Sequence, residues 1–284
     1  MVDLSKLLAL PLILLQFVIH SQQSTYKQLH DALQLKNVSS LEIPIGGFEE
    51  DTVIEESSDP SKSSSTEWWV NSGGGFVTIG GIGKTFHGDS PAGSKWQTAY
   101  ERTNPTDTDN GLHPQNIFRL VRTGSWANPT QQVYFRINKD NLSDSVQRND
   151  SNGILFFNRY LDGENLYYAG IRVDGSIVVK KKLNGLYYTL GLTQYYLGTY
   201  DREKNPNLLP KNTWIGIMSE VYSRENIVLI NVYVDPNATG QWELVLEAQD
   251  NGGQGELLLE PGNAGIRTDF MDIEFTGYSI TEKK

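Results

Sequence analysis

The sequence predicts an all-β protein whose folded part is a β-sandwich, and two observations indicate this class. The chain of 284 residues holds 27 glycines, 14 tyrosines and 6 tryptophans, and only 20% of its residues are charged, which is typical of strands. Short apolar-rich runs recur between turn signals from about residue 67 to the end of the chain, and several alternate apolar with polar residues. No helical heptad and no repeat period is apparent.

The first 22 residues read as a signal peptide or a membrane anchor. Lys6 precedes an apolar run from Leu7 to Ile19, which is short for a bilayer span and contains Pro11. No clean small-x-small cleavage site follows, so both interpretations stay open. We expect a secreted or cell-surface protein without a transmembrane domain beyond this N-terminal segment.

A short helix and a flexible linker are predicted to precede the sandwich. Residues 23–45 hold the helix, and residues 46–66 are acidic and rich in serine. Such a composition cannot bury enough apolar surface to order itself. We therefore assign residues 23–66 to this helix and linker and residues 67–284 to the sandwich domain.

A three-stranded antiparallel meander over residues 165–190 forms the centre of the predicted domain. Asp174-Gly175 and Asn184-Gly185 tolerate the positive φ angles of two-residue hairpin turns. Such turns set a register in which Tyr167 faces Lys182, and Lys182 faces Tyr187. We assign the layer richer in aliphatic residues to the core, namely Leu166, Tyr168, Gly170, Arg172, Ile177, Val179, Lys181, Leu183, Leu186, Tyr188 and Leu190. The other layer carries Tyr167, Lys180, Lys182 and Tyr187; the reverse assignment of the faces stays open.

Two further strands alternate clearly. One turns Val133, Phe135 and Ile137 to one side, and the other turns Val228, Ile230, Val232 and Val234 to one side. Their opposite, outward sides carry Gln132, Tyr134 and Arg136 in the first strand and Asn231 and Tyr233 in the second.

Composition excludes several classes of function. The chain has no cysteine, so disulfides, thiolate metal sites and a cysteine nucleophile are absent. Its net charge of −10 argues against a nucleic-acid partner.

Three passages resemble the concanavalin A-like (laminin-G-like) jelly roll of lectins, glucanases and alginate lyases. They are WANPTQQVYFR from Trp126, the meander YYAGIRVDGSIVVKKKLNGLYYTL, and GNAGIRTDFMDIEFTGYSI from Gly262. The resemblance implies a jelly-roll β-sandwich over roughly residues 67 to 282. It does not imply one activity, because the fold hosts binding proteins, hydrolases and lyases alike.

The enzymatic motifs of this superfamily are incomplete. Retaining glucanases carry E-x-D-x-E on one strand, but Phe270 stands two positions before Asp272, where the nucleophile is required. We therefore expect Asp272 and Glu274 to face solvent, with a minor alternative in which Asp272 holds a structural Ca²⁺. No other cofactor is expected. A hydrolase is thus less favoured than a polysaccharide lyase that cleaves a uronate-containing glycan by β-elimination.

The lyase motifs of the superfamily are not intact either. A lyase would combine Gln132, Tyr134 and Arg136 with His113 and Tyr187, which would supply the carboxylate-neutralising, base and acid groups. Whether the protein is an enzyme stays open.

The leading hypothesis is recognition of a polysaccharide or glycoconjugate on one open sheet face. Aromatic rings stack on sugars, and polar side chains reach hydroxyl and carboxylate groups. The predicted binding residues are Gln132, Tyr134, Arg136, Tyr167, Lys180, Lys182, Tyr187, Asn231 and Tyr233. A surface adhesion or assembly module with protein partners is the third hypothesis.

Overall fold

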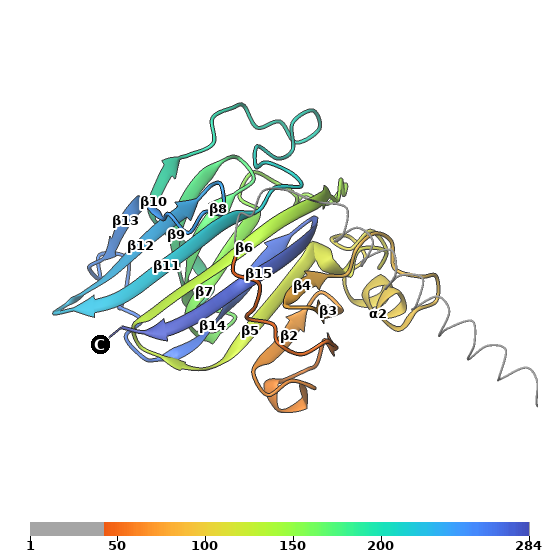
Figure 1. The fold of residues 1–284 in the computed structure, drawn as a ribbon, viewed down its shortest axis with the longest axis horizontal. Coiled ribbons are helices and arrows are strands. Elements are labelled where there is room, and N and C mark those ends of the chain that lie inside the picture. The colour runs from red at the N-terminus through yellow and green to blue at the C-terminus, as the bar shows by residue number, and fades with distance from the viewer. Residues whose placement is uncertain (1–42, 284) are drawn as a thin grey trace, which may run out of the picture. The chain divides into compact units, whose positions relative to one another are not determined.

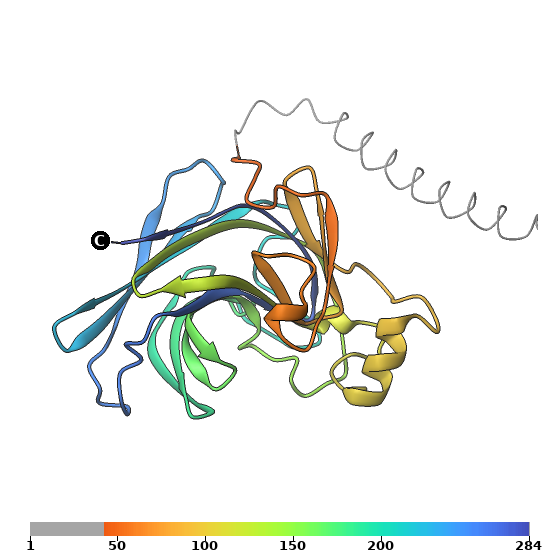
Figure 2. The same ribbon diagram turned by 90° about the horizontal axis from the view of Figure 1, so that it is seen from below.

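The computed structural model describes residues 43–283 as two antiparallel sheets packed face to face (Figure 2). The predicted jelly-roll sandwich is therefore confirmed. The predicted signal or anchor, residues 1–22, and the predicted short helix up to residue 42 lie outside the described residues. Within residues 43–283, no helix has both the length and the apolar character needed to cross a membrane.

The first sheet has eight strands, and their order places the last strand of the chain near the middle (Figure 1). In spatial order the strands are β1 (Thr52–Glu55), β3 (Gly75–Ile79), β4 (Ile82–Thr85), β15 (Met271–Glu282), β6 (Pro129–Asp140), β11 (Ile215–Arg224), β12 (Ile227–Asp235) and β13 (Glu243–Asp250).

The second sheet has seven strands, and four of them follow one another directly in the chain. In spatial order they are β10 (Leu186–Gln194), β9 (Ser176–Leu183), β8 (Asn165–Arg172), β7 (Gly153–Asp162), β14 (Gly262–Asp269), β5 (Ile117–Trp126) and β2 (Trp68–Ser72). Within residues 43–283, three short helices lie outside the sheets: 3₁₀ helices at Pro60–Lys62 and Pro114–Asn116, and α2 at Lys95–Thr103.

The core lies between the two sheets, and the alternating strands fill it as predicted. Val133, Phe135 and Ile137 of β6 point inward and are fully buried. The apolar face of β12 (Val228, Ile230, Val232 and Val234) does the same. Burial of these aliphatic and aromatic side chains is the main term that stabilises the sandwich.

The sandwich begins earlier than predicted. Residues 52–55 form β1 and pair with β3, in the register Thr52↔Thr78 to Glu55↔Gly75. Phe48 and Ile54 are both buried in the core. The prediction of a flexible linker over residues 46–66 is therefore wrong, because these two large apolar side chains anchor a segment whose average composition is polar. Residues 43–45, predicted as the end of the short helix, are not helical.

The predicted register of the meander is correct at one turn and wrong at the other. Asn184 and Gly185 have φ angles of +50° and +82°, and their two-residue turn sets Tyr187 opposite Lys182 as expected. The other turn has three residues between Arg172 and Ser176, and its Gly175, at φ +80°, donates its backbone N–H to the Arg172 carbonyl oxygen at 3.0 Å. The extra residue sets Tyr167 opposite Lys181.

This shift of one residue reverses the two faces of β8, because successive side chains alternate. Tyr167, predicted to face outward, lies in the core with Ala169 and Ile171. Tyr168, predicted to be in the core, packs instead on the outer face, in a small cluster with Leu166 and Val178. The inward assignment of Ile177, Val179, Lys181 and Leu183 on β9 is correct.

Candidate functional site

The outward residues of β6 are occupied by contacts within the eight-stranded sheet. Tyr134 is only 1% exposed, because its ring lies 5.5 Å from that of Trp242, and its hydroxyl donates to Asp235 at 3.3 Å. Arg136 donates to Glu274 through Nε and Nη2, at 2.8 and 2.5 Å, and its guanidinium carbon lies 4.7 Å from the centre of the Trp214 ring. Tyr134 is therefore not accessible to a sugar, and Arg136 is already neutralised by Glu274.

The other predicted residues of this face are also engaged or set apart. Asn231 and Tyr233 of β12 both donate to Glu220, at 3.4 and 2.7 Å. Gln132 is half-buried on β6, where it is opposite Met218 of β11. Because β6 and β12 belong to the eight-stranded sheet and β9 and β10 to the seven-stranded one, the prediction of one shared binding surface is wrong.

The predicted lyase set is not assembled in the structure. His113 lies before the helix at Pro114–Asn116, where its Nδ1 is 2.7 Å from Asp109 and its Nε2 is 3.0 Å from Asp89. Tyr134 and Arg136 lie on the opposite sheet from Tyr187. A β-elimination that needs these groups around one sugar ring is therefore not possible in this arrangement.

Tyr167 has a structural position. Its hydroxyl donates to Asp250 at 2.8 Å and accepts from the backbone N–H of Leu258 at 3.2 Å. Lys181, which is fully buried, completes the group with its amine 2.8 Å from the same Asp250 oxygen. The result is a buried network that ties β8, β9 and β13 together.

Asp272 and Glu274 do not face solvent as predicted. One oxygen of Asp272 accepts from Gly88 N at 2.8 Å, and the other accepts from Gln115 and Asn141 at 2.9 and 3.1 Å. Three hydrogen-bond donors thus contact this carboxylate. Over residues 43–283, no group of three or more histidine, aspartate or glutamate side chains has the arrangement of a metal site.

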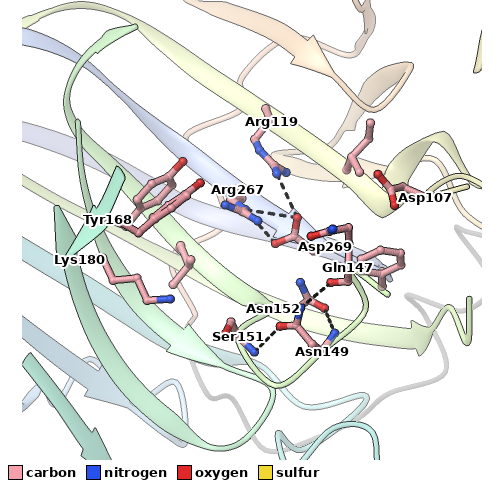
Figure 3. A pocket seen from close by; sticks show the side chains of 14 residues that line it. Asp107, Arg119, Gln147, Asn149, Ser151, Asn152, Tyr168, Lys180, Arg267 and Asp269 are labelled. Carbon is pink, nitrogen blue, oxygen red and sulfur yellow. Dashed lines mark hydrogen bonds and ion pairs between the residues drawn. The ribbon is translucent and has the colours of Figure 1, made fainter. Parts of the chain in front are cut away.

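A pocket of about 360 Å³ lies on the outer face of the seven-stranded sheet (Figure 3). Its lining comes from six strands, namely β5, β7, β8, β9, β10 and β14, and its rim from loop residues 147–152. We call it the sheet pocket and define it by Arg119, Tyr168, Lys180, Tyr187, Arg267, Asp269 and that loop. The volume is in the range of small-molecule pockets.

Two arginines share one buried carboxylate at the base of the sheet pocket. Arg119 of β5 and Arg267 of β14 are cross-strand partners, so their side chains lie next to each other. Asp269, which is 3% exposed, accepts from Arg267 Nε at 2.9 and 3.2 Å and lies 3.1 Å from Arg119 Nη2. Figure 3 shows the carboxylate between the two guanidinium groups.

Electrostatics explain why Asp269 is needed there. Burial and the neighbouring Arg267 lower the pKa of Arg119, and Asp269 opposes this effect. Burial also acts to lower the pKa of Arg267, but Asp269 and Tyr168 outweigh it and raise that pKa. One carboxylate thus holds two adjacent guanidinium groups in their charged forms.

Tyr168 and Tyr187 form the aromatic wall of the sheet pocket. Their rings are stacked with centres 6.0 Å apart and planes 27° apart. Tyr168 is buried and backs the wall, whereas Tyr187 is 52% exposed and presents aromatic surface to solvent. Lys182 lies 5.2 Å from the centre of the Tyr187 ring and donates to Glu164 at 3.2 Å, so this predicted binding residue supports the wall from outside the pocket.

Lys180 is the third cation of the sheet pocket. It pairs with Tyr168 across β8 and β9, which places both side chains on the outer face. Burial, together with the positive charges of Arg172 and Arg267, lowers the pKa of Lys180. No hydrogen bond or ion pair joins its amine to any group within residues 43–283.

The rim supplies short polar side chains. Asn149 accepts from Ser151 N at 2.9 Å, and Asn152 accepts from Asn149 N at 2.7 Å, so local hydrogen bonds fix the loop. Asn149 Nδ2 donates to the carbonyl oxygen of Gln147 at 3.2 Å. The pocket therefore combines an exposed aromatic ring, three cations and fixed amide groups.

Sequence reasoning identified Lys180 and Tyr187 but missed Arg119, Tyr168, Arg267 and Asp269. A signal for three of them was present. Arg119 interrupts a run in which Phe118 and Leu120 face the core, and Arg267 and Asp269 alternate with buried residues near the end of β14. Charged residues at the outward positions of otherwise apolar strands were therefore the pattern to follow.

No protein-family model and no curated protein matches this sequence. Among solved structures, the carbohydrate-binding module CBM66 from Bacillus subtilis is similar, with a TM-score of 0.46, 12% identity, and coverage of 76% of this chain and 96% of that one. The acidic lectin of winged bean, solved with methyl-α-D-galactose, has a TM-score of 0.48, 11% identity and coverage of 76% and 92%.

A β-glucanase from Bacillus licheniformis has a TM-score of 0.43, 12% identity and coverage of 82% of this chain and 98% of its own. At these values the similarity carries no information about function, and the fold assignment rests on the two sheets themselves.

Proposed function

We propose that this protein binds carbohydrate in the sheet pocket. The observation that carries the proposal is the half-exposed Tyr187 ring, stacked on Tyr168 inside a pocket of about 360 Å³ that also holds unpaired polar groups. A flat aromatic face favours the apolar side of a sugar ring, while guanidinium, amine and amide groups satisfy its oxygens. Export, expected from the first 22 residues, would give this pocket access to extracellular glycans.

The test compares two tyrosine variants by calorimetric titration after screening on an array of neutral and acidic glycans. Tyr187→Ala removes the exposed wall, and we expect it to weaken binding of the selected glycan about fivefold, since stacked aromatic contacts are worth on the order of 1 kcal/mol. Tyr222→Ala is the matched control because Tyr222 lies on β11 of the opposite sheet, and its binding should equal that of the wild type.

Three results would contradict the proposal in different ways. If Tyr187→Ala binds the selected glycan with wild-type affinity, the glycan binds outside the sheet pocket. Loss of binding in Tyr222→Ala would move the site to the eight-stranded sheet. No retained glycan, together with a stable complex with a protein partner, would favour the adhesion hypothesis.

A polysaccharide lyase is the second candidate, because Tyr187 and Arg267 both line the sheet pocket and could supply a base and a carboxylate-neutralising group. Burial raises the pKa of Tyr168 to about 12. Burial also acts to raise the pKa of Tyr187, but Arg267, Lys182 and a hydrogen bond from Tyr168 outweigh it and lower that pKa.

In this reaction Tyr187 would take the C5 proton of a uronate, the C4–O bond would break, and a water molecule would protonate the leaving oxygen. Arg267 would neutralise the substrate carboxylate. Incubation with uronans should then release products with the ultraviolet absorbance of an unsaturated uronate, and Tyr187→Phe should abolish this release. If the protein binds uronans but releases no such product, the lyase hypothesis is excluded and carbohydrate binding without catalysis remains.

A further inference from the structure

The cations of the sheet pocket differ in how many of their hydrogen-bond donors are already used. Arg119 is fully engaged: Nη1 donates to the carbonyl oxygens of Phe118 and Thr268 at 2.8 and 3.3 Å, and Nη2 contacts Asp269. Arg267 bonds Asp269 through Nε alone. Its two terminal nitrogens have no carboxylate or carbonyl partner within residues 43–283, and the Lys180 amine has none either.

The charge inside the sheet pocket is opposite in sign to that of the whole protein. Arg119, Lys180 and Arg267 give +3, and Asp107 and Asp269 give −2, so the lining side chains sum to +1. The complete chain carries −10. A local excess of cations inside an acidic protein requires a reason, because half-buried cations without partners are unfavourable.

The two carboxylates of the sheet pocket leave one of its three cations without a counter-charge. Both oxygens of Asp269 accept from Arg267 Nε, and Arg119 shares one of them. Asp107 accepts from Ser145 Oγ at 2.5 Å and from Asn104 Nδ2 at 3.1 Å. The Tyr187 hydroxyl is a hydrogen-bond partner of Arg267, but no anionic group of the pocket faces the Arg267 terminal nitrogens or the Lys180 amine, so a bound anion would find charged donors there.

The two available cations flank the same tyrosine. Lys180 is the cross-strand partner of Tyr168, and the guanidinium carbon of Arg267 lies 5.6 Å from the centre of the Tyr168 ring. Tyr187 stacks on that ring. A group bound between Lys180 and Arg267 would therefore be attached to a sugar ring that contacts the aromatic wall.

We infer that the ligand of the sheet pocket is an acidic sugar whose carboxylate binds between the terminal nitrogens of Arg267 and the amine of Lys180. This inference rests on the proposed carbohydrate-binding function and names its ligand class. A guanidinium fork matches the two oxygens of a carboxylate, and the amine adds a third charged donor. The net charge of +1 inside the sheet pocket attracts the carboxylate, although the complete chain, with a charge of −10, would repel it.

The experiment uses a two-by-two comparison of ligand and protein. The ligands are oligomers of galacturonate, mannuronate and glucuronate, together with the same oligomers after methyl esterification, which removes the charge and keeps the sugar. The proteins are the wild type and Lys180→Gln. We expect esterification and Lys180→Gln each to weaken binding about tenfold, and Lys180→Gln to leave the ester affinity unchanged.

The matched control is Lys139→Gln. Lys139 is exposed on β6 of the other sheet, and its loss changes the net charge by the same amount. It should retain wild-type affinity for the acidic oligomers, which separates the local contact from the overall charge. Circular dichroism spectra and urea midpoints equal to the wild type would show that each variant is folded.

The outcomes separate this inference from the proposed function. Equal affinity for acid and ester, or tight binding of neutral glycans only, overturns the acidic-sugar assignment and leaves carbohydrate binding intact. If Lys180→Gln and Lys139→Gln weaken the binding of acidic oligomers equally, the proposed contact between Lys180 and the sugar carboxylate is overturned. Absence of binding to acidic and neutral glycans alike overturns the proposed function itself.

Discussion

The two outer faces of the sandwich carry the same types of residue but use them differently. On the eight-stranded sheet, Arg136 is paired with Glu274 and lies against Trp214, and Tyr134 is covered by Trp242. On the seven-stranded sheet, Lys180 has no partner within residues 43–283, and Tyr187 is half exposed. The difference teaches that arginine and tyrosine mark a binding site only where their donors and ring faces remain unsatisfied.

The carboxylates of the two faces should differ most in their effect on stability. Asp269→Asn would leave two adjacent guanidinium groups without a buried counter-charge, and we expect a loss of about 3 kcal/mol in the free energy of unfolding. Glu274→Gln would leave Arg136 more than a quarter exposed and still against Trp214, so the loss should be about 1 kcal/mol.

Urea unfolding of each variant and the wild type measures both losses in the free energy of unfolding, provided that their m-values are equal. Equal losses would show that the two ion pairs are equivalent and would remove the contrast between the faces.

The aromatic cover of the eight-stranded face depends on a glycine. A Cβ at Gly216 would lie 2.8 Å from both Trp242 Cη2 and Tyr134 Cε1. We expect Gly216→Ala to cost about 2 kcal/mol, because the two rings must move apart. Gly163→Ala is the control, since a Cβ at that position meets no atom within 4 Å and should change stability little. A tolerated Gly216→Ala would mean that the Trp242 ring moves freely and that this face is open.

The pH dependence of the two tyrosines should have opposite signs. Burial, and then Asp235, raises the pKa of Tyr134 to about 12, so the stability due to its neutral hydroxyl is complete below about pH 10 and is lost as the pH rises towards 12. Between pH 8 and pH 11, Tyr134→Phe should therefore gain about 1 kcal/mol relative to the wild type.

Tyr187 has a lowered pKa in the folded protein, so its ionised form adds stability above the pKa of the unfolded chain, and Tyr187→Phe should lose stability relative to the wild type over the same range. Urea midpoints of the three proteins at the two pH values test both signs. Parallel changes in the two variants would refute the electrostatic contrast.

The alternation of side chains gave correct inner and outer positions where a strand has one clearly apolar face. Val228 to Val234 of β12 is the clearest case. Alternation could not assign β8, because Tyr167 and Tyr168 are both tyrosines and their neighbours are apolar on both sides. For that strand the assignment depended on turn length, and the turn after Arg172 holds one residue more than predicted.

The location of the site was less predictable than the fold. Each strand indicates which of its sides is outward, but no strand indicates to which sheet it belongs. The outward residues of β6 and of β9 were therefore placed together although their sheets are opposite. Pairing is a second property that residue types do not reveal: both outward arginines have a carboxylate partner, but Arg136 uses Nε and Nη2 on Glu274, whereas Arg267 uses Nε alone on Asp269.

The three-residue turn at Val173, Asp174 and Gly175 decides which tyrosine the chain presents on its surface. Shortening it by one residue would rotate the whole of β8 about its axis relative to β9, placing Tyr167 outside and Tyr168 inside. Related proteins with the same strand sequences and a different turn length would then have unlike surfaces. Small insertions and deletions at this hairpin are thus a route by which new ligand preferences can evolve without any substitution in the sheet.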